Sequence, residues 1–354
     1  MAASNDFLVF AGGAGANVLS QPQYAARSEI PTGVQSGQAS SALFNKTVRQ
    51  SSIIASMIGQ FIANQSGANA TDDGTTATLL ANFIASIQAT TRRRFTANTN
   101  FYVNPSTGND TNLGLTTAAP FRTIQGAITA ISSLWDFAGF AATINLADGT
   151  YTATSGQSIA VFGPGTPPMT LVGNIANPGN VVISALNGAA LLVADATLTI
   201  GGGYTLQATG TGTGGSAGIG LVCVNTGSVN LTGTVRFGAC GFSHVRAAAH
   251  STILLSSPYS IAGAAPCHTY LDTMGVIASS AAVTVTGTPN FSNAFALVSQ
   301  NSCLTNNGGS FTGSATGQRY NVTSGSIITG TGSTSFFPGS VAGTVDSASF
   351  SSYS

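Results

Sequence analysis

Charged side chains are scarce in this chain. Only 6% of its 354 residues are Asp, Glu, Lys or Arg, against about a quarter in an ordinary globular domain. The ten basic and ten acidic residues cancel, so no net field gathers nucleic acid or an anionic membrane. We therefore exclude both as main partners, and most of the surface must consist of hydroxyl and amide groups.

Long apolar runs are also absent. The longest, around residues 53–63, is far shorter than the roughly 20 residues that a membrane span needs, and no signal peptide is visible at the N-terminus. We expect a protein made in a cytoplasm, without membrane insertion. The four cysteines form no CxxC pair, and Cys223, Cys240 and Cys303 lie beside Val and Leu. We interpret them as buried thiols and expect no metal and no cofactor.

Carboxylates that could serve catalysis are few. Glu29 is the only glutamate. Six aspartates lie beyond residue 96: Asp110, Asp136, Asp148, Asp195, Asp272 and Asp346. Glycoside hydrolysis usually needs two carboxylates about 5 to 10 Å apart. Because these aspartates are spread singly along the chain, the sequence predicts no enzyme.

What the chain does have is a repeat of two strand-like segments, returning six times between residues 189 and 337. The first strands align on six anchors: Leu198, Val229, Ile253, Val283, Cys303 and Ile327. The second strands align on six more: Tyr204, Val235, Tyr259, Phe291, Phe311 and Phe336. Both series lengthen and shorten together, with spacings of roughly 20 to 30 residues. This pattern predicts a β-solenoid, in which each coil buries its apolar side chains by stacking on its neighbours.

Two helical patterns precede the repeat, in residues 45–67 and 75–94. Their apolar stripes comprise Ile54, Met57, Ile58, Phe61 and Ile62 in the first, and Leu80, Phe83, Ile84 and Ile87 in the second. Gly67 is placed to stop the first helix, and Arg92, Arg93 and Arg94 are expected to close the second, where cations favour the helix dipole. The stripes are too long for the short opening segment to cover, so we expect copies of the chain to pack on them.

Residues 10–26 and 32–52 resemble the N-terminal region of bacteriophage tail-fibre proteins. That family has a Gly-Ala-Asn-Val-Leu stretch, matched here at Asn17, and a later Leu-x-Asn-Lys-x-x-Arg-Gln-Ser module. The module is matched at Asn45, Lys46, Arg49 and Gln50. The resemblance implies that these five residues belong to a virion-attachment motif.

A second resemblance covers residues 101–128, 144–152 and 317–344. These segments are similar to the beginning and the end of right-handed parallel β-helix proteins, which include phage tailspikes and pectate-lyase-like domains. In that pattern Gly108, Asp110 and Gly114 shape a turn, and the residues after it lead into a capping helix. The expected fold is therefore mainly β: a right-handed parallel β-helix behind a small helical N-terminal region.

Together the resemblances imply a structural protein of the phage virion, either a tail fibre or a short tailspike. We expect a homotrimer with three regions: residues 1–95 bind a phage tail or baseplate protein, residues 96–142 hold the β-helix lead-in and capping helix, and residues 143–354 form the β-helix. Binding of a host surface glycan stays open. One alternative is a polysaccharide depolymerase, with an acid pair formed between subunits. Another is a connector fibre that docks a separate receptor-binding protein.

The coil lengths suggest where a receptor would bind. Two long coils gain residues after their second strand, at 209–218 and 265–274, so both insertions are predicted to be loops on one side of the solenoid. The second carries His268, Tyr270 and Asp272, which can stack on a sugar and hydrogen-bond to it. The alternative is an insertion that only packs on a neighbouring subunit. Asp195 is not expected to have a second acid beside it. It lies three residues before the anchor Leu198, and the same offset on the other coils gives Thr226, His250, Ser280, Gln300 and Ser324, none of them acidic.

Overall fold

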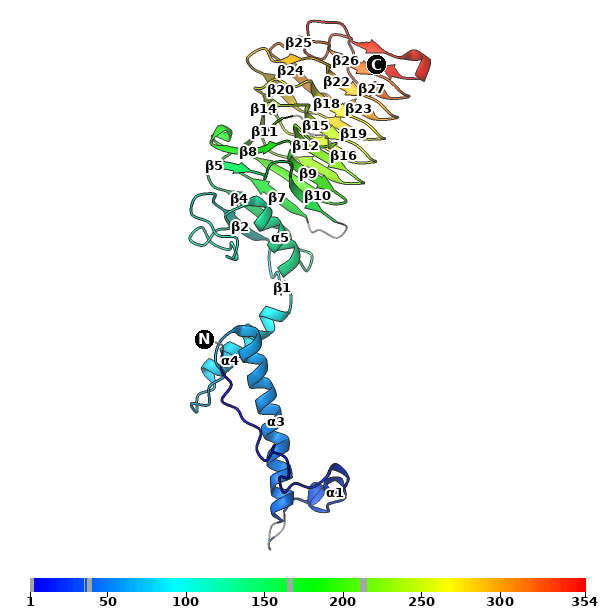
Figure 1. Ribbon diagram of the computed structural model, residues 1–354. Helices are drawn as coiled ribbons and strands as arrows, with labels where there is room; N and C mark the ends of the chain where they lie inside the picture. The colour runs from blue at the N-terminus through cyan, green and yellow to red at the C-terminus, as the bar shows by residue number, and fades with distance from the viewer. Residues whose placement is uncertain (1–2, 35, 37–39, 164–167, 211–214) are drawn as a thin grey trace. The chain divides into compact units, whose positions relative to one another are not determined.

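The computed structural model describes residues 3–34, 36, 40–163, 168–210 and 215–354 (Figure 1). The chain forms two compact units, Met1–Arg93 and Arg94–Ser354. Within the described ranges, no helix combines the length and the apolar character that crossing a membrane requires.

The first unit is helical. Its helices are α1 (Gln21–Ala25), α2 (Glu29–Thr32), α3 (Ser41–Ser66) and α4 (Ala77–Thr90). Helix α3 begins after Ser40, whose side chain accepts a hydrogen bond from the Leu43 N–H, and it ends at Gly67 in the left-handed conformation, as predicted. The prediction that three arginines close the second helix is wrong. Thr91 is already extended, and Arg93–Arg94 form the short strand β1.

Helices α3 and α4 pack on each other through part of their apolar stripes. The rings of Phe61 and Phe83 meet edge to face, with centroids 6.2 Å apart, and Ile62 is fully buried. The opening segment runs along α3, where Asn5 donates a hydrogen bond to the Ser56 carbonyl at 2.9 Å. A Cβ at Gly59 would collide with the Asn5 side chain. This close approach explains a glycine inside a helix, where it costs about 1 kcal/mol relative to alanine.

The second unit opens with β2 (Thr99–Val103), helix α5 (Ile124–Leu134) and β3 (Trp135–Asp136). Helix α5 buries Ile124, Ile128 and Ile131 at helical spacing. Its first turn is capped by Thr123, which accepts a hydrogen bond from the Gly126 N–H at 2.9 Å. The Asp110 carboxylate also accepts from the backbone N–H groups just before the helix. The sequence therefore has both the cap and the apolar face that this helix needs.

The rest of the second unit is a parallel solenoid of about eight turns, built from three sheets. The first sheet contains β2, β4 (Ala142–Leu146), β7 (Met169–Val172), β10 (Thr197–Gly202), β13 (Ser228–Leu231), β16 (Thr252–Leu255), β19 (Val276–Ser279), β23 (Cys303–Asn306), β27 (Ile327–Thr329) and β29 (Ser352–Tyr353). The second contains β5 (Gly149–Thr152), β8 (Val181–Leu186), β11 (Tyr204–Thr209), β14 (Val235–Cys240), β17 (Tyr259–Ile261), β20 (Ala282–Val285) and β24 (Ser310–Thr312). The third contains β6 (Ile159–Phe162), β9 (Ala189–Ala194), β12 (Ile219–Val224), β15 (Ser243–Ala247), β18 (Cys267–Leu271), β22 (Ala294–Val298), β26 (Tyr320–Val322) and β28 (Thr344–Val345). Short elements complete the unit: β21 (Asn290–Phe291), β25 (Thr316–Gly317), and the 3-10 turns η1 (Pro178–Asn180) and η2 (Ser347–Ser349).

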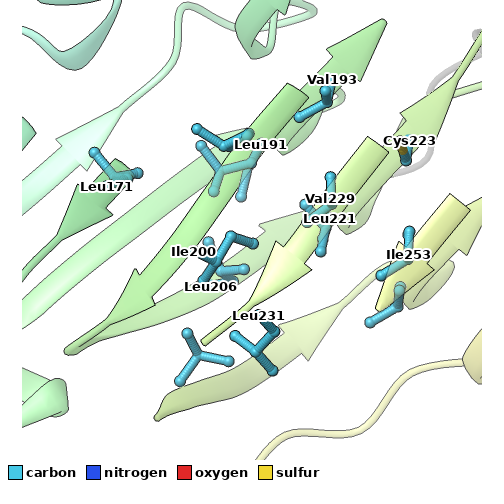
Figure 2. Packing of buried hydrophobic residues seen from close by; sticks show 14 of the residues in the cluster. Leu171, Leu191, Val193, Ile200, Leu206, Leu221, Cys223, Val229, Leu231 and Ile253 are labelled. Atoms are coloured by element: carbon cyan, nitrogen blue, oxygen red, sulfur yellow. The ribbon is translucent and has the colours of Figure 1, made fainter. Parts of the chain in front are cut away.

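The mainly β fold and its parallel stacking are as predicted. Most turns visit the three sheets in the same order, and the strands of one sheet lie side by side (Figure 1). Side chains of successive turns point into one shared interior, as Leu191 does above Leu221 and Ile200 above Leu231 (Figure 2). Each coil therefore has no core of its own and depends on its neighbours.

The predicted anchor stack is correct for its first three members and wrong for the last three. Leu198, Val229 and Ile253 are paired across β10, β13 and β16. The stack then continues through Ile277, Leu304 and Ile328. Val283 belongs to the second sheet, and Cys303 and Ile327 lie one residue out of register. A shift of one residue turns a side chain to the other face of the sheet, and Ile327 is accordingly 42% exposed.

The second series is correct for Tyr204, Val235, Tyr259 and Phe311, which share the second sheet with Val283. Phe291 lies instead in β21 and pairs with β25, and Phe336 is outside the named strands. The repeat also has a third strand that the sequence interpretation missed. In β12, β15, β18 and β22 at least three successive residues are buried, so the strict alternation that identifies a strand is lost.

Candidate functional site

The segment predicted to be a receptor-binding loop is a strand. Residues Cys267–Leu271 form β18 in the third sheet, between β15 and β22, so the prediction of a loop at 265–274 is wrong. The residues that resemble an insertion in the sequence form the third strand of this coil, and every regular turn has such a strand. The other predicted loop, at 209–218, begins at Thr209, the last residue of strand β11. Residues 211–214 of this segment lie outside the residues that the structure describes.

The three predicted residues, two in β18 and Asp272 directly after it, have different environments. His268 is fully buried, Asp272 is 6% exposed, and Tyr270 is half-buried. Tyr270 stands beside Arg246 in the third sheet, where their Cα atoms are register partners. The structure therefore brings Tyr270 and Asp272 together around Arg246 and places His268 in the interior.

Arg246 and Asp272 form a two-bonded ion pair. The Arg246 Nη2 lies 2.7 Å from Asp272 Oδ2, and Nε lies 3.2 Å from Oδ1. The Arg246 guanidinium also donates to the Gly215 carbonyl and lies 5.3 Å from the centroid of the Tyr270 ring. Phe242 meets the same ring edge-on at 5.1 Å. Burial, followed by the Asp272 charge, raises the pKa of Tyr270, so this phenol stays neutral and offers an O–H at ordinary pH.

His268 takes part in a buried polar chain. Its Nδ1 lies 3.1 Å from Nδ1 of His244, and its Nε2 lies 2.8 Å from the Tyr259 hydroxyl. The His268 ring packs on Phe237 and Phe295. Burial lowers the pKa of His244 to about 4 and holds the pKa of His268 well below its ordinary value, because a charged imidazole loses its hydration there. Both rings are therefore neutral at pH 7, and neither reaches the surface.

The aspartates of the second unit have separate local partners. Asp110 accepts from the lead-in of α5, Asp148 from the amides of Asn174 and Asn180, and Asp346 from the Ala348 N–H. Asp136 accepts from the Ala138 N–H. No cluster of three or more His, Cys, Asp or Glu side chains suited to a metal occurs among the residues that the structure describes.

Asp195 lies on a ladder of tight turns between the third and first sheets. Thr226 donates to it at 3.4 Å, and backbone hydrogen bonds link the successive turns that contain His250, Gln300 and Ser324. Thr226 and His250 agree with the predicted offset. Gln300 and Ser324 lie one residue before the true equivalents, Asn301 and Gly325, because their anchors Cys303 and Ile327 are one residue out of register. Ser280 is not on this ladder, because it follows β19 in the first sheet; its assignment depended on the misplaced anchor Val283. The ladder places no acid on the turns next to Asp195.

The predicted attachment residues all lie in the first unit. Asn45 donates to the Asn17 carbonyl at 2.8 Å, and Asn17 donates to the Ser41 hydroxyl at 3.0 Å. The Lys46 ammonium lies 5.8 Å from the centroid of the Tyr24 ring, and its side chain is buried. Arg49 is half-buried and Gln50 is exposed. The motif therefore joins the opening segment to the start of α3, with Gln50 open to solvent.

A groove on the first turn of the solenoid was not foreseen from the sequence. Its volume is about 610 Å³, and it lies between the start of α5 and strands β5 and β6. Arg122 and Phe162 are among its lining residues. No sequence motif marks it, because segments 25 to 40 residues apart, 122–125 and 150–162, form its walls. Only the outward position of a large aromatic at the end of β6 could have drawn attention. No model of a known protein family matches this chain, and no curated protein matches it.

Proposed function

We propose that this chain is a structural protein of a phage virion, either a tail fibre or a short tailspike. The observation that carries the proposal is a long parallel solenoid preceded by a separate helical unit. The resemblance of residues 10–52 to tail-fibre N-termini supports attachment through the first unit. In this proposal the solenoid faces the host, and the protein resides in the phage tail after synthesis in the host cytoplasm.

A homotrimer is part of the proposal. Although α3 and α4 pack on each other, large apolar side chains stay exposed on both: Ile54 is 53% exposed, Met57 60% and Leu80 58%. Ile84 and Ile87 on α4 are also exposed, at 46% and 41%. Large apolar side chains left exposed on two helices usually mark an interaction site, and three-fold closure would bury them without polymerisation. Light scattering on the purified chain should give three times the mass of 35.2 kDa. A stable monomer would contradict this assignment.

The attachment role is tested by deleting the first unit, residues 1–93, which leaves Phe95 in the core of the second unit. The truncated chain should keep the circular dichroism of a β-solenoid and should be missing from virions assembled in its presence. The matched variant Gln50→Ala changes an exposed motif residue without removing any hydrogen bond that holds the first unit together. It should reduce incorporation while the protein stays folded. Incorporation of the truncated chain at normal levels would place the attachment surface in the solenoid.

We infer binding without cleavage of host polysaccharide. The support is that the aspartates of the second unit have separate local partners, whereas hydrolysis of a glycosidic bond generally needs a pair of carboxylates. Purified protein incubated with host polysaccharide should bind it and release no oligosaccharide. Release would favour the depolymerase alternative. Absence of any binding to host cells would favour a connector fibre.

A further inference from the structure

The groove on the first solenoid turn has the size of a small-molecule site. Its volume of about 610 Å³ lies within the roughly 300 to 1,000 Å³ of known ligand pockets. Buried Ile124, Tyr151 and Ile159 are among its lining residues. The groove lies wholly within the second unit, between α5, β5 and β6.

The walls of the groove are held by hydrogen bonds, so it is formed in advance of binding. Gln125 on α5 joins the helix to β6, accepting from the Ala160 N–H at 2.8 Å and donating to the Ala160 carbonyl at 3.2 Å. The Tyr151 hydroxyl shares its proton between the carbonyl oxygens of Val103 and Ala147, at 3.0 and 2.8 Å. A preformed site loses little conformational entropy when a ligand binds.

The polar lining is rich in hydroxyl and amide groups and has one charge. Thr150, Thr152, Thr154 and Gln157 are exposed along it. Arg122 is the only charged side chain among the described lining residues. The nearby carboxylate of Asp110 is already engaged by the backbone N–H groups of Arg122 and Thr123, both at 2.9 Å, and by the Thr123 hydroxyl at 2.8 Å. The backbone N–H groups just before α5 therefore already have an acceptor, and the Arg122 guanidinium is the group that can attract an anion.

An aromatic ring completes the lining. Phe162, at the end of β6, is 59% exposed and lines the same groove as Arg122. An exposed aromatic face beside hydroxyl and amide groups suits a pyranose ring, which has an apolar C–H face and a rim of hydroxyls. A nucleic acid would need several cations along its backbone, and a peptide anchor would need a deep apolar pocket.

We propose that this groove binds one segment of an acidic saccharide, with a sugar carboxylate on Arg122 and a ring face on Phe162. The groove alone supports the chemical class of the ligand. The assignment rests on the proposed function only for the source of the saccharide, which is the host surface. The absence of an acid among the described lining residues favours binding without cleavage, since neither a general acid nor a nucleophile faces the sugar.

Calorimetric titration of the full-length protein tests the proposal. The probes are trigalacturonate, sialyllactose and a hyaluronan tetrasaccharide, each beside its neutral counterpart: galactotriose, lactose and tetra-N-acetylchitotetraose. At least one acidic probe should bind, and its neutral counterpart should bind about tenfold more weakly or worse, because a charge-assisted hydrogen bond is lost. Arg122→Gln should cause a similar loss of affinity for the acidic probe and little change in affinity for the neutral one.

Phe162→Ala should weaken the binding of both probes of a pair, because it removes an aromatic surface on which either sugar ring can pack. The matched control is Arg236→Gln, which removes an exposed arginine on β14; it should leave binding unchanged. The proposal is overturned if no acidic probe binds at millimolar concentration, if neutral probes bind equally well, or if Arg236→Gln is as harmful as Arg122→Gln. Virions carrying Arg122→Gln test the host role separately. Normal adsorption by virions whose protein no longer binds the probe would count against the host function and leave the saccharide assignment intact.

Discussion

Removing the Asp272 carboxylate should destabilise the solenoid strongly. The side chains of Asp272 and Arg246 are 8% and 15% exposed, and their closest atoms are 2.7 Å apart. Among the residues that the structure describes, Asp272→Ala would leave the guanidinium with the Gly215 carbonyl and the Tyr270 ring. Breaking a buried ion pair from one side costs about 3 to 5 kcal/mol. Because Arg246 retains some contact with water, we expect a loss near the lower end, about 3 kcal/mol.

Equilibrium unfolding of the full-length protein in guanidinium chloride, followed by circular dichroism, measures this loss. Asp148→Ala is the matched control. Asp148 is exposed and accepts hydrogen bonds from the side-chain amides of Asn174 and Asn180. Its removal should cost less than about 1 kcal/mol. If the two variants lie within about 0.5 kcal/mol of each other, the Arg246–Asp272 pair is not a stabilising element and the reasoning fails.

A double-mutant cycle separates the ion pair from other effects of the substitution. If the pair carries the loss, Arg246→Ala together with Asp272→Ala should cost less than the sum of the two single variants, since the second change removes the unpaired charge left by the first. A coupling of about 1 to 3 kcal/mol is expected for groups in contact. Strict additivity would indicate that each residue acts independently through its own packing.

Three further predictions follow from burial. Ile328→Ala should lower the free energy of unfolding by about 2 to 5 kcal/mol, and Ile327→Ala by less than about 1 kcal/mol, because Ile328 is fully buried and Ile327 is 42% exposed. Equal losses in chemical unfolding would refute the register of this strand. The pKa of His244 is lowered from 6.5 to about 4, so between these pH values the unfolded chain binds more protons than the folded one. The free energy of unfolding should therefore fall by on the order of 3 kcal/mol as the pH drops through that window. A denaturant midpoint that does not move between about pH 7 and 4 contradicts this. In the native protein Cys303 should react first with a thiol reagent at about pH 8, because burial raises the thiol pKa of the other three cysteines; simultaneous reaction of all four would argue against the buried interior.

The parallel solenoid could be predicted because two anchor series vary in spacing together, and only stacked coils require this. The register failed at residues 276–285. The true first-sheet strand there, Val276–Ser279, ends in small and polar residues, whereas the following Ala282–Val285 alternates more clearly. Local alternation therefore selected the wrong strand, and the later anchors were displaced with it. Only the pairing with neighbouring coils identifies the correct one.

The candidate sites were harder to predict for a related reason. The sequence pattern favours an insertion at residues 265–274, because the third strand of each turn carries no clear alternation. Once that strand is recognised, Arg246 and Tyr270 become register partners, and Asp272 lies two residues after Tyr270. The ion pair, which links residues 26 positions apart, is then a consequence of coil length. The groove has no such periodic signal, since a helix and two strands each contribute part of it.

The scarcity of charge limits how this surface can recognise anything. In the second unit the two closely opposed charges of Arg246 and Asp272 are used within the fold, and several aspartates are used in turns and caps. Few ions are then left to contact a partner. Recognition on such a surface must rely on hydroxyl and amide hydrogen bonds, exposed rings and an occasional single cation. Arg122 is therefore the more informative residue. One exposed guanidinium in a hydroxyl-lined groove can discriminate between an acidic and a neutral sugar, because the nearby Asp110 carboxylate is engaged by two backbone N–H groups and the Thr123 hydroxyl.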